Sequence, residues 1–343
     1  MRTGAFHRWA PGFGILIGLE AKPAFAAKPL QYLNGFGPKA YPVVALTWGL
    51  LAISIIVVVV ISLLVIIGIW RRRVPGHVAI AATPVVRGGN GLRWIFIGVG
   101  ISGITLLGSL IWTMVVLAAV NGPPTPAKLT IDVTGQQWWW SARYLSSDPS
   151  RIFMTADEVH IPVGHPVQIR LIGADVIHSF WVPALSGQTY AIPGQTNVIW
   201  IEASHPGRYR GQCNQYCGVQ HAHMIFYVVA DPPRVFQAWW SAQLRPAPAP
   251  RSSIAVAGEQ LFLARCGACH TVRGSGAGGV MGPDLTHLMS RNTLAGGMLE
   301  NTIGNLSGWI ANPQAVKPGT LMPTPYLSGP ELHDIATYLE TLR

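Results

Sequence analysis

Two long apolar runs dominate the first third of the chain, and shorter alternating runs follow them. The residues from Val43 to Trp70 and from Trp94 to Val120 include no charged side chain. An apolar helix of about 20 residues crosses the roughly 30 Å hydrocarbon core of a membrane. A buried helix of a soluble protein rarely needs so long an uncharged run. The pattern therefore predicts a transmembrane hairpin within residues 27–120, with spans at about 43–70 and 94–120.

Beyond residue 128 the apolar residues alternate with polar ones in short runs separated by Gly, Pro and Asn. These runs cover residues 129–134, 167–172, 197–201 and 225–229. A period of two is typical of half-buried strands, and runs at this spacing predict an antiparallel β-sandwich or barrel. We place this all-β domain at residues 121–241.

A stretch rich in Pro and Ala separates the β-domain from a helical one. Residues 242–253 include the run Arg-Pro-Ala-Pro-Ala-Pro, which favours a stiff extended linker. In the remaining domain, residues 254–343, a first helix is predicted from Ala257 to Cys266. The last helix is indicated by Ser328 and Glu331, which have the spacing of a capping box. An apolar stripe follows them, made of Leu332, Ile335, Ala336, Leu339 and Leu342.

Charge is distributed unevenly between these parts. The chain has a net charge of +10, and residues 1–120 hold ten Lys or Arg and one acidic residue. Five of these arginines lie between the two spans. Lys and Arg gather on the cytoplasmic side of a membrane, so this loop is predicted to be inside and both chain ends outside. The basic balance therefore indicates membrane topology and not nucleic-acid binding.

The first 26 residues have the features of a secretory signal peptide. Arg2 and Arg8 precede a short apolar run from Phe13 to Leu19, and Ala24-Phe25-Ala26 resembles a cleavage site. The alternative is an uncleaved N-terminal arm, because the apolar run is short and Glu20 follows it. Cleavage after Ala26 agrees with outer placement of the domains that follow.

All four cysteines fall into two short motifs rich in metal-binding side chains. The first has the spacing Cys-x3-Cys-x3-His-x2-Met and comprises Cys213, Cys217, His221 and Met224. Thiolates and imidazoles suit copper, and a weakly bound Met tunes its potential. Two thiolates can bridge two coppers if a second imidazole is available, and His178 is the candidate. The alternatives are a disulfide or a zinc site, although zinc loops usually have no trailing Met.

The second motif is Cys266-Gly-Ala-Cys269-His270, the attachment pattern of a c-type haem. The two thiols would form thioether bonds to the haem, and His270 would be an axial ligand of the iron. Two one-electron centres in one membrane-anchored chain predict an electron-transfer protein.

Residues 30–240 resemble subunit II of cytochrome c oxidase. The matching strings are Gly135–Trp140, His178–Pro183, Ala191–Thr196 and Gly211–Gly218 with the residues after it. The resemblance implies a cupredoxin barrel that carries a dinuclear copper centre, CuA, after two transmembrane helices. Its implied ligands are His178, Cys213, Cys217, His221, Met224 and the backbone carbonyl of Gln215.

The resemblance also implies one further role and exposes two departures from the family. Trp138 occupies the position where the family passes electrons from an external cytochrome into copper, and a core tryptophan is the alternative. Gln215 stands where the family usually has a Glu that helps to bind magnesium beside subunit I, which puts magnesium binding in question. Arg93 stands where the family often has a Glu at the mouth of a proton path, so that path is not assumed.

Residues 254–343 resemble class I cytochrome c domains, which are all-α. The resemblance implies that the carbonyl of Pro283 orients His270. Met322, shortly before the last helix, matches the sixth ligand of the iron, with Met281 as the second choice.

Together these features predict a multidomain membrane protein, with a transmembrane hairpin, an all-β cupredoxin barrel and an all-α cytochrome c domain. The implied function is electron input to an aa3-like haem–copper oxidase. Electrons would pass from an external cytochrome or other donor through haem c and CuA to subunit I, where oxygen is reduced to water with proton translocation. Subunit III is a further expected partner. The implied location is a bacterial inner membrane, with both metal domains on its outer face.

Other functions use some of the same features. The copper subunit of a nitric oxide reductase would use the same electron path, and the chain does not discriminate between the two. A quinol oxidase subunit is disfavoured because such subunits lose the copper ligands, and the haem motif argues against a copper carrier. Residues 121–240 carry seven acidic and seven basic residues, and residues 251–343 carry six of each. Two neutral domains joined by a linker are expected to need no strong electrostatic steering.

Overall fold

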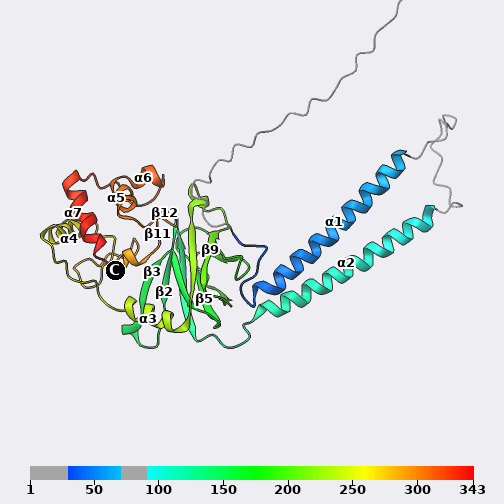
Figure 1. The fold of residues 1–343 in the computed structure, drawn as a ribbon, viewed down its shortest axis with the longest axis horizontal. Helices are drawn as coiled ribbons and strands as arrows, with labels where there is room; N and C mark the ends of the chain where they lie inside the picture. The colour runs from blue at the N-terminus through cyan, green and yellow to red at the C-terminus, as the bar shows by residue number, and fades with distance from the viewer. Residues whose placement is uncertain (1–29, 71–90) are drawn as a thin grey trace, which may run out of the picture.

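The computed structural model describes residues 30–70 and 91–343 (Figure 1). The predicted signal peptide, residues 1–26, lies outside the described residues. So does the segment 71–90, which contains most of the arginines behind the topology prediction. Arg93 is described, and it lies exposed in the first turn of the second helix.

Two apolar helices, α1 (Ala40–Trp70) and α2 (Gly91–Asn121), run side by side away from the β-domain (Figure 1). Each has 31 residues and is long and apolar enough to cross a membrane. At 1.5 Å per residue such a helix is about 46 Å long. The helices approach closely at Gly49, where a Cβ atom would lie 2.2 Å from the ring of Trp112. They contain both predicted apolar runs: each helix begins three residues before its run, and α2 also ends one residue after it.

Ten strands form two five-stranded sheets that enclose one core, which confirms the predicted all-β class. The strand order is β3-β2-β1-β5-β8 in the first sheet and β4-β10-β9-β6-β7 in the second. The first sheet comprises β1 (Leu129–Gln136), β2 (Trp139–Tyr144), β3 (Phe153–Ala156), β5 (Val167–Gly173) and β8 (Asn197–Ile201). The second comprises β4 (Glu158–Pro162), β6 (His178–Trp181), β7 (Thr189–Ala191), β9 (Gly207–Cys213) and β10 (Ile225–Asp231).

Both sheets are mixed, which corrects the predicted antiparallel arrangement. β1 pairs with β5 in parallel, and β10 pairs with β4 in parallel. The chain leaves the first sheet after β3, forms β4 in the second sheet and returns as β5 beside β1. Alternation of polar and apolar residues reports which face of a strand is buried, and it carries no information on the direction of the neighbouring strand.

An aromatic cluster fills the core beneath one end of the sandwich. The rings of Phe180 and Phe226 stack at 4.5 Å, and Trp140 packs edge-on against Phe180 at 5.7 Å. Gly211 makes room for this cluster, because a Cβ atom there would lie 2.2 Å from the ring of Phe226. The Trp140 ring also lies 5.9 Å from the imidazole of His178. The core therefore supports one of the predicted metal ligands directly.

The β-domain ends with a helix, α3 (Pro233–Gln243), that the sequence pattern did not predict. Its buried Phe236 and Trp240 belong to the core of the β-domain. The Pro/Ala linker follows and lies along the C-terminal domain, where the amide of Ala247 donates to the carbonyl of Arg273 over 2.7 Å. The linker is thus anchored to the C-terminal domain, and its stiffness stays a prediction.

The C-terminal domain is helical, as predicted, apart from one short hairpin. Its helices are α4 (Ser253–Arg265), α5 (Ile303–Ala311), α6 (Pro313–Val316) and α7 (Gly329–Glu340). The hairpin is formed by β11 (Thr293–Leu294) and β12 (Leu299–Glu300). The capping box of Ser328 and Glu331 is present, and α4 begins four residues before the predicted start. α4 crosses α7 closely at Gly258, where a Cβ atom would lie 2.0 Å from the carbonyl oxygen of Asp334.

Candidate metal centre and haem site

The loop between β9 and β10 brings the first cysteine motif together. Cys213 ends β9 and Met224 directly precedes β10, so the antiparallel pairing of these strands closes the loop at its base. The amide of Cys213 donates to the carbonyl of Met224 over 3.0 Å. β6 pairs with the other side of β9, with Phe180 opposite Cys213, and this register places His178 beside the loop.

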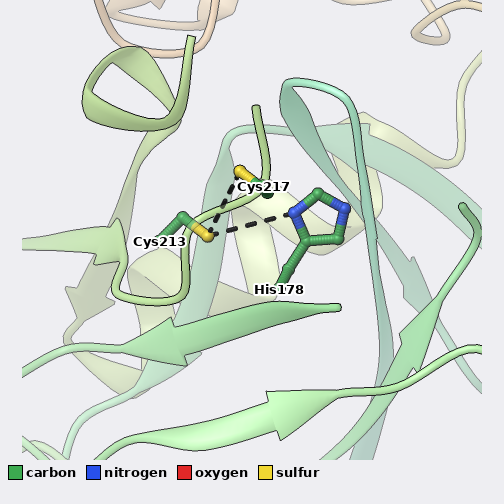
Figure 2. Close-up of side chains that lie close together, drawn as sticks. All are labelled: His178, Cys213 and Cys217. Carbon is green, nitrogen blue, oxygen red and sulfur yellow. Dashed lines mark hydrogen bonds between the residues drawn. The ribbon is translucent and has the colours of Figure 1, made fainter. Parts of the chain in front are cut away.

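Three of the predicted donors face one another in a buried cluster (Figure 2). The Sγ atom of Cys213 lies 3.8 Å from Sγ of Cys217 and 3.9 Å from Nδ1 of His178. A disulfide has an S–S bond of about 2.05 Å, so this spacing is that of two free thiols. The disulfide alternative is therefore wrong for this structure.

The other three predicted donors surround the same two sulfur atoms. Sγ of Cys217 lies 3.6 Å from Nδ1 of His221 and 3.9 Å from Sδ of Met224. Sγ of Cys213 lies 3.3 Å from the carbonyl oxygen of Gln215. The fold therefore gathers all six atoms that the sequence proposed as ligands.

The electrostatics of the cluster favour a thiolate. The pKa of Cys213 is lowered to about 4, because the thiol of Cys217 donates to it and His178 and two backbone amides lie close. The pKa of Cys217 is raised, because its neighbour is then an anion and the site is buried. In the absence of metal the pair thus holds one proton near neutral pH. A cation that displaces this proton gains a second thiolate.

Asp175 is a contributor that the sequence reasoning missed. Its Oδ1 atom lies 2.7 Å from Nε2 of His178, and its Oδ2 atom accepts the amide of Gln137 at 2.7 Å. Burial alone would lower the pKa of His178, but hydrogen bonds with Cys213 and Asp175 raise it overall. A carboxylate on the far nitrogen orients an imidazole and strengthens it as a ligand. The only signal in the sequence is an acidic residue three positions before the histidine.

Two side chains of the β1–β2 turn form hydrogen bonds with the main chain of Cys217. Nε2 of Gln137 and Nε1 of Trp138 both donate to the carbonyl oxygen of Cys217, at 2.7 and 2.9 Å. Gly218 allows this contact, because its φ is +119° and a Cβ atom there would lie 2.9 Å from the indole. Gln137 was not singled out from the sequence, since one amide in a polar turn carries no motif.

The donor chemistry fits copper better than zinc. The cluster combines two thiols, two imidazoles and a thioether, with Met224 fully buried beside Cys217. A thioether suits copper and is absent from ordinary zinc sites. His223 turns away from the cluster, and its Nδ1 atom lies 2.6 Å from Oε1 of Gln220.

The second cysteine motif follows α4. The thiols of Cys266 and Cys269 are free, and the amide of His270 donates to the carbonyl of Cys266 over 3.0 Å. Nδ1 of His270 lies 2.8 Å from the carbonyl oxygen of Pro283, the contact that the resemblance to cytochromes predicted. This bond leaves Nε2 as the nitrogen available to iron. Gly282 must be small here, because a Cβ atom would lie 2.6 Å from the imidazole.

Met322 lies in the loop before α7. Its carbonyl oxygen accepts a hydrogen bond of 3.0 Å from Nε2 of Gln314, which also binds the carbonyl of Thr320. Met322 is half-buried, whereas Met281 is 75% exposed. The role of Met322 as the sixth iron ligand stays a prediction.

The C-terminal domain also leaves large apolar side chains uncovered. They lie in the two segments that hold the predicted axial ligands and their neighbours, and they are Val280, Met281, Leu321 and Tyr326. Free thiols and an oriented imidazole, with these exposed apolar side chains near the predicted iron ligands in the sequence, fit a haem.

The C-terminal domain lies against the β-domain (Figure 1), and it contacts the loop that carries the candidate copper ligands. The carbonyl of Gly296 accepts the amide of Ile225 at 3.0 Å, and the carbonyl of Pro318 accepts Nε2 of Gln220 at 2.8 Å. On the same interface the amide of Asn292 donates to the buried Glu158 at 2.8 Å. The two domains therefore meet through several specific polar contacts.

Two families match separate parts of the chain. Residues 142–231 match the periplasmic domain of cytochrome c oxidase subunit II, and residues 255–343 match cytochrome c. The chain carries a cytochrome c oxidase subunit II domain fused to a cytochrome c domain. A copper site is implied by the subunit II domain, and a haem by the cytochrome c domain.

Proteins named cytochrome c oxidase subunit 2 are similar over about three fifths of this chain. The one from Alkalihalophilus pseudofirmus (strain OF4) is 38% identical over 215 residues, which are 62% of this chain and 61% of the relative. The one from Bacillus sp. (strain PS3) is 30% identical over 227 residues, 63% of this chain and 62% of the relative. The chain thus spans about three fifths of the length of these relatives.

A crystal structure of the periplasmic domain of subunit II of cytochrome oxidase from Bradyrhizobium japonicum is also similar. It has 32% sequence identity and a TM-score of 0.32, and the match covers 35% of this chain and 95% of that one.

Proposed function

We propose that this chain is the electron-input subunit of a respiratory haem–copper oxidase. It would take electrons from an external donor and pass them through haem c and CuA to subunit I, which reduces oxygen to water with proton translocation. Oxygen chemistry then belongs to the partner subunit, and this chain binds, orients and insulates the path that leads to it.

The residues proposed for each centre follow from the contacts described above. CuA, with two coppers, would be held by His178, Cys213, Cys217, His221, Met224 and the carbonyl of Gln215. One covalent haem would be held by Cys266, Cys269, His270 and Met322. When bound, each group supplies a site that takes up and releases one electron at a time. The chain itself provides a buried, preformed set of donors, so little rearrangement accompanies a change of charge.

The observation that supports this proposal most strongly is the contact between the cytochrome c domain, or haem domain, and the loop from Cys213 to Met224, which we call the copper loop. Gly296 and Pro318 of the cytochrome c domain bind the segment between Gln220 and Ile225, which includes Met224. A copper carrier would have no use for a haem domain fixed at this place. Electron transfer requires such proximity.

We propose the following division of the chain. A signal peptide covers residues 1–26, a transmembrane hairpin 27–120, the CuA domain 121–241, a linker 242–253 and the cytochrome c domain 254–343. The protein would lie in a bacterial inner membrane with both metal domains on the outer face. The exposed apolar sides of α1 and α2 would pack against subunit I and lipid, with subunit III as a further member of the complex. Magnesium at the subunit I interface is not proposed, since Gln215 provides no carboxylate.

Purification of the intact complex tests the proposal. We expect a near-infrared absorption band from CuA, a visible band from haem c and consumption of oxygen in the presence of a reduced donor. Consumption of nitric oxide in place of oxygen would assign the chain to a nitric oxide reductase. Full haem loading without a near-infrared copper band would contradict the assignment of the copper site.

A further inference from the structure

Lys317 of the cytochrome c domain is buried in the contact with the copper domain. Its side chain is 2% exposed, and its Nζ atom donates to three carbonyl oxygens. They belong to Trp138 at 2.6 Å, His223 at 2.9 Å and Ala295 at 3.0 Å. An ammonium group has three N–H donors, so each of them has an acceptor here.

These three carbonyls belong to three different segments. Trp138 lies in the β1–β2 turn and His223 in the copper loop, both in the CuA domain. Ala295 lies in the β11–β12 turn of the cytochrome c domain itself. The turn is shaped around the ammonium, because a Cβ atom at Gly296 would lie 2.4 Å from Nζ. Lys317 thus connects the two metal domains through one side chain.

The surroundings of Lys317 carry complementary charge. Asp157 and Glu158 of the CuA domain are buried on this interface and interact electrostatically with Arg291 of the haem domain. Asp157 also interacts with Lys317. Equal numbers of acidic and basic residues led us to expect no strong electrostatic steering between the domains, and these local contacts do not test that expectation. Net charge does not report which charges meet in a contact.

The docked position covers Trp138 with the loop that precedes the proposed axial ligand. Trp138 is 7% exposed, and a Cβ atom at Gly319 would lie 3.5 Å from its ring. Met322 follows three residues later on this loop. On the other side, the indole N–H of Trp138 donates to the carbonyl of Cys217. Two hydrogen bonds therefore join Lys317 to the main chain of a proposed copper ligand, through Trp138.

We propose that Lys317 is a positioning residue that holds the cytochrome c domain docked with its Met322 loop over Trp138. The docked position follows from the contacts alone, and its role in electron transfer rests on the proposed function. With both groups bound, the docked position would serve the passage of one electron from a reduced haem to an oxidised copper centre. No bond forms or breaks, and no proton is transferred. A second consequence is that an external donor meets the haem domain, since Trp138 is already covered.

Amide hydrogen exchange on the purified complex tests the docking without relying on turnover. The amides of Ile225 and Asn292 bind acceptors in the opposite domain, so they report on the interface. We expect slow exchange of both in the wild type. In Lys317→Met both should exchange at least about tenfold faster, the factor that corresponds to losing one charged hydrogen bond. Arg343→Met is the matched control, because it removes one positive charge from an exposed position of the same domain.

A second readout is the rate of electron transfer from haem to copper after rapid reduction of the haem. Lys317→Met should slow this rate at least tenfold while the haem and copper absorption bands are retained. Arg343→Met should leave the rate unchanged.

Three results would overturn the proposal. The first is fast hydrogen exchange of the Ile225 and Asn292 amides in the wild type. The second is a Lys317→Met variant whose amide exchange rates and electron-transfer rate equal those of the wild type. The third is loss of haem from Lys317→Met, which would place the role of Lys317 in the folding of its own domain. Absence of the copper band in the wild type would contradict the proposed function. The docking would still be supported if the Ile225 and Asn292 amides exchanged slowly in the wild type and faster in Lys317→Met.

Discussion

The indole N–H of Trp138 donates a hydrogen bond of 2.9 Å to the carbonyl oxygen of Cys217, 79 residues further along the chain. Trp138 lies in the turn between β1 and β2, whereas Cys217 lies in the loop before β10. The bond fixes the edge of the indole against the main chain of a proposed copper ligand. The carbonyl of the same tryptophan accepts Nζ of Lys317. Trp138 is therefore held from both domains.

Replacement of Trp138 by Phe tests this hydrogen bond. The ring is retained, the N–H is lost, and the carbonyl of Cys217 keeps its bond from Gln137. We expect the free energy of unfolding to fall by about 1 kcal/mol beyond the cost of the smaller ring. Trp240→Phe is the control, because the buried Nε1 atom of Trp240 has no hydrogen-bond partner within the described residues. Equal losses in the two variants, measured by chemical denaturation, would show that the bond contributes nothing.

Replacement of one cysteine in each motif separates the two proposed cofactors. Cys217→Ser removes a thiolate that lies 3.8 Å from Cys213 and close to both His221 and Met224. We expect the near-infrared copper band to disappear while the haem spectrum stays. Cys266→Ser should have the opposite effect, with a copper band and an altered haem attachment. Two coppers and normal electron transfer in Cys217→Ser would contradict the proposed site.

Removal of the carboxylate behind His178 tests the role of Asp175. Asp175→Asn keeps the size of the side chain but replaces the charged acceptor beside Nε2. Loss of such an outer partner weakens metal binding by about 10- to 100-fold, and we expect a decrease of that order in copper affinity, measured by competition with a chelator. Asp148→Asn, an exposed carboxylate bonded to Ser150, should leave copper affinity unchanged. A normal affinity in Asp175→Asn would reduce Asp175 to a turn residue.

Asp157 predicts a pH dependence of stability. Burial raises the pKa of this carboxyl to about 6, although the amide of Trp140 and the charges of Lys317 and Arg291 act in the opposite direction. The folded chain therefore binds more protons than the unfolded chain between about pH 4 and pH 6. The contribution of Asp157 to stability is present below this window and is lost as the pH rises through it, by about 3 kcal/mol in all.

Asp157→Asn tests this expectation. Asn accepts the same amide, tolerates the φ of 58° and carries no charge at any pH. Guanidinium unfolding of both chains at pH 4 and pH 8 should show the wild type losing stability relative to the variant as the pH rises. A constant difference between the two chains would show that the carboxyl does not change its protonation on folding.

The sequence alone predicted α1, α2 and the grouping of four possible donors on one loop, for a physical reason. An uncharged run of the length of α1 has few stable environments other than a membrane, and the spacing of Cys213, Cys217, His221 and Met224 confines four donors to one loop. The Cys266–His270 motif is equally local. In each case the chemistry lies within about twelve residues, so no knowledge of distant contacts is required.

The tertiary structure decided everything that depends on distant segments meeting. It brought His178 and its partner Asp175 to the copper loop, and it made two strand pairs parallel where alternation had suggested antiparallel ones. Lys317 is the clearest case, because a lone lysine in a helical domain gives no sign of partners 94 and 179 residues away. Spacing along the chain determines which atoms can share one loop. Which loops come together depends on the packing of the whole fold, and no short motif records it.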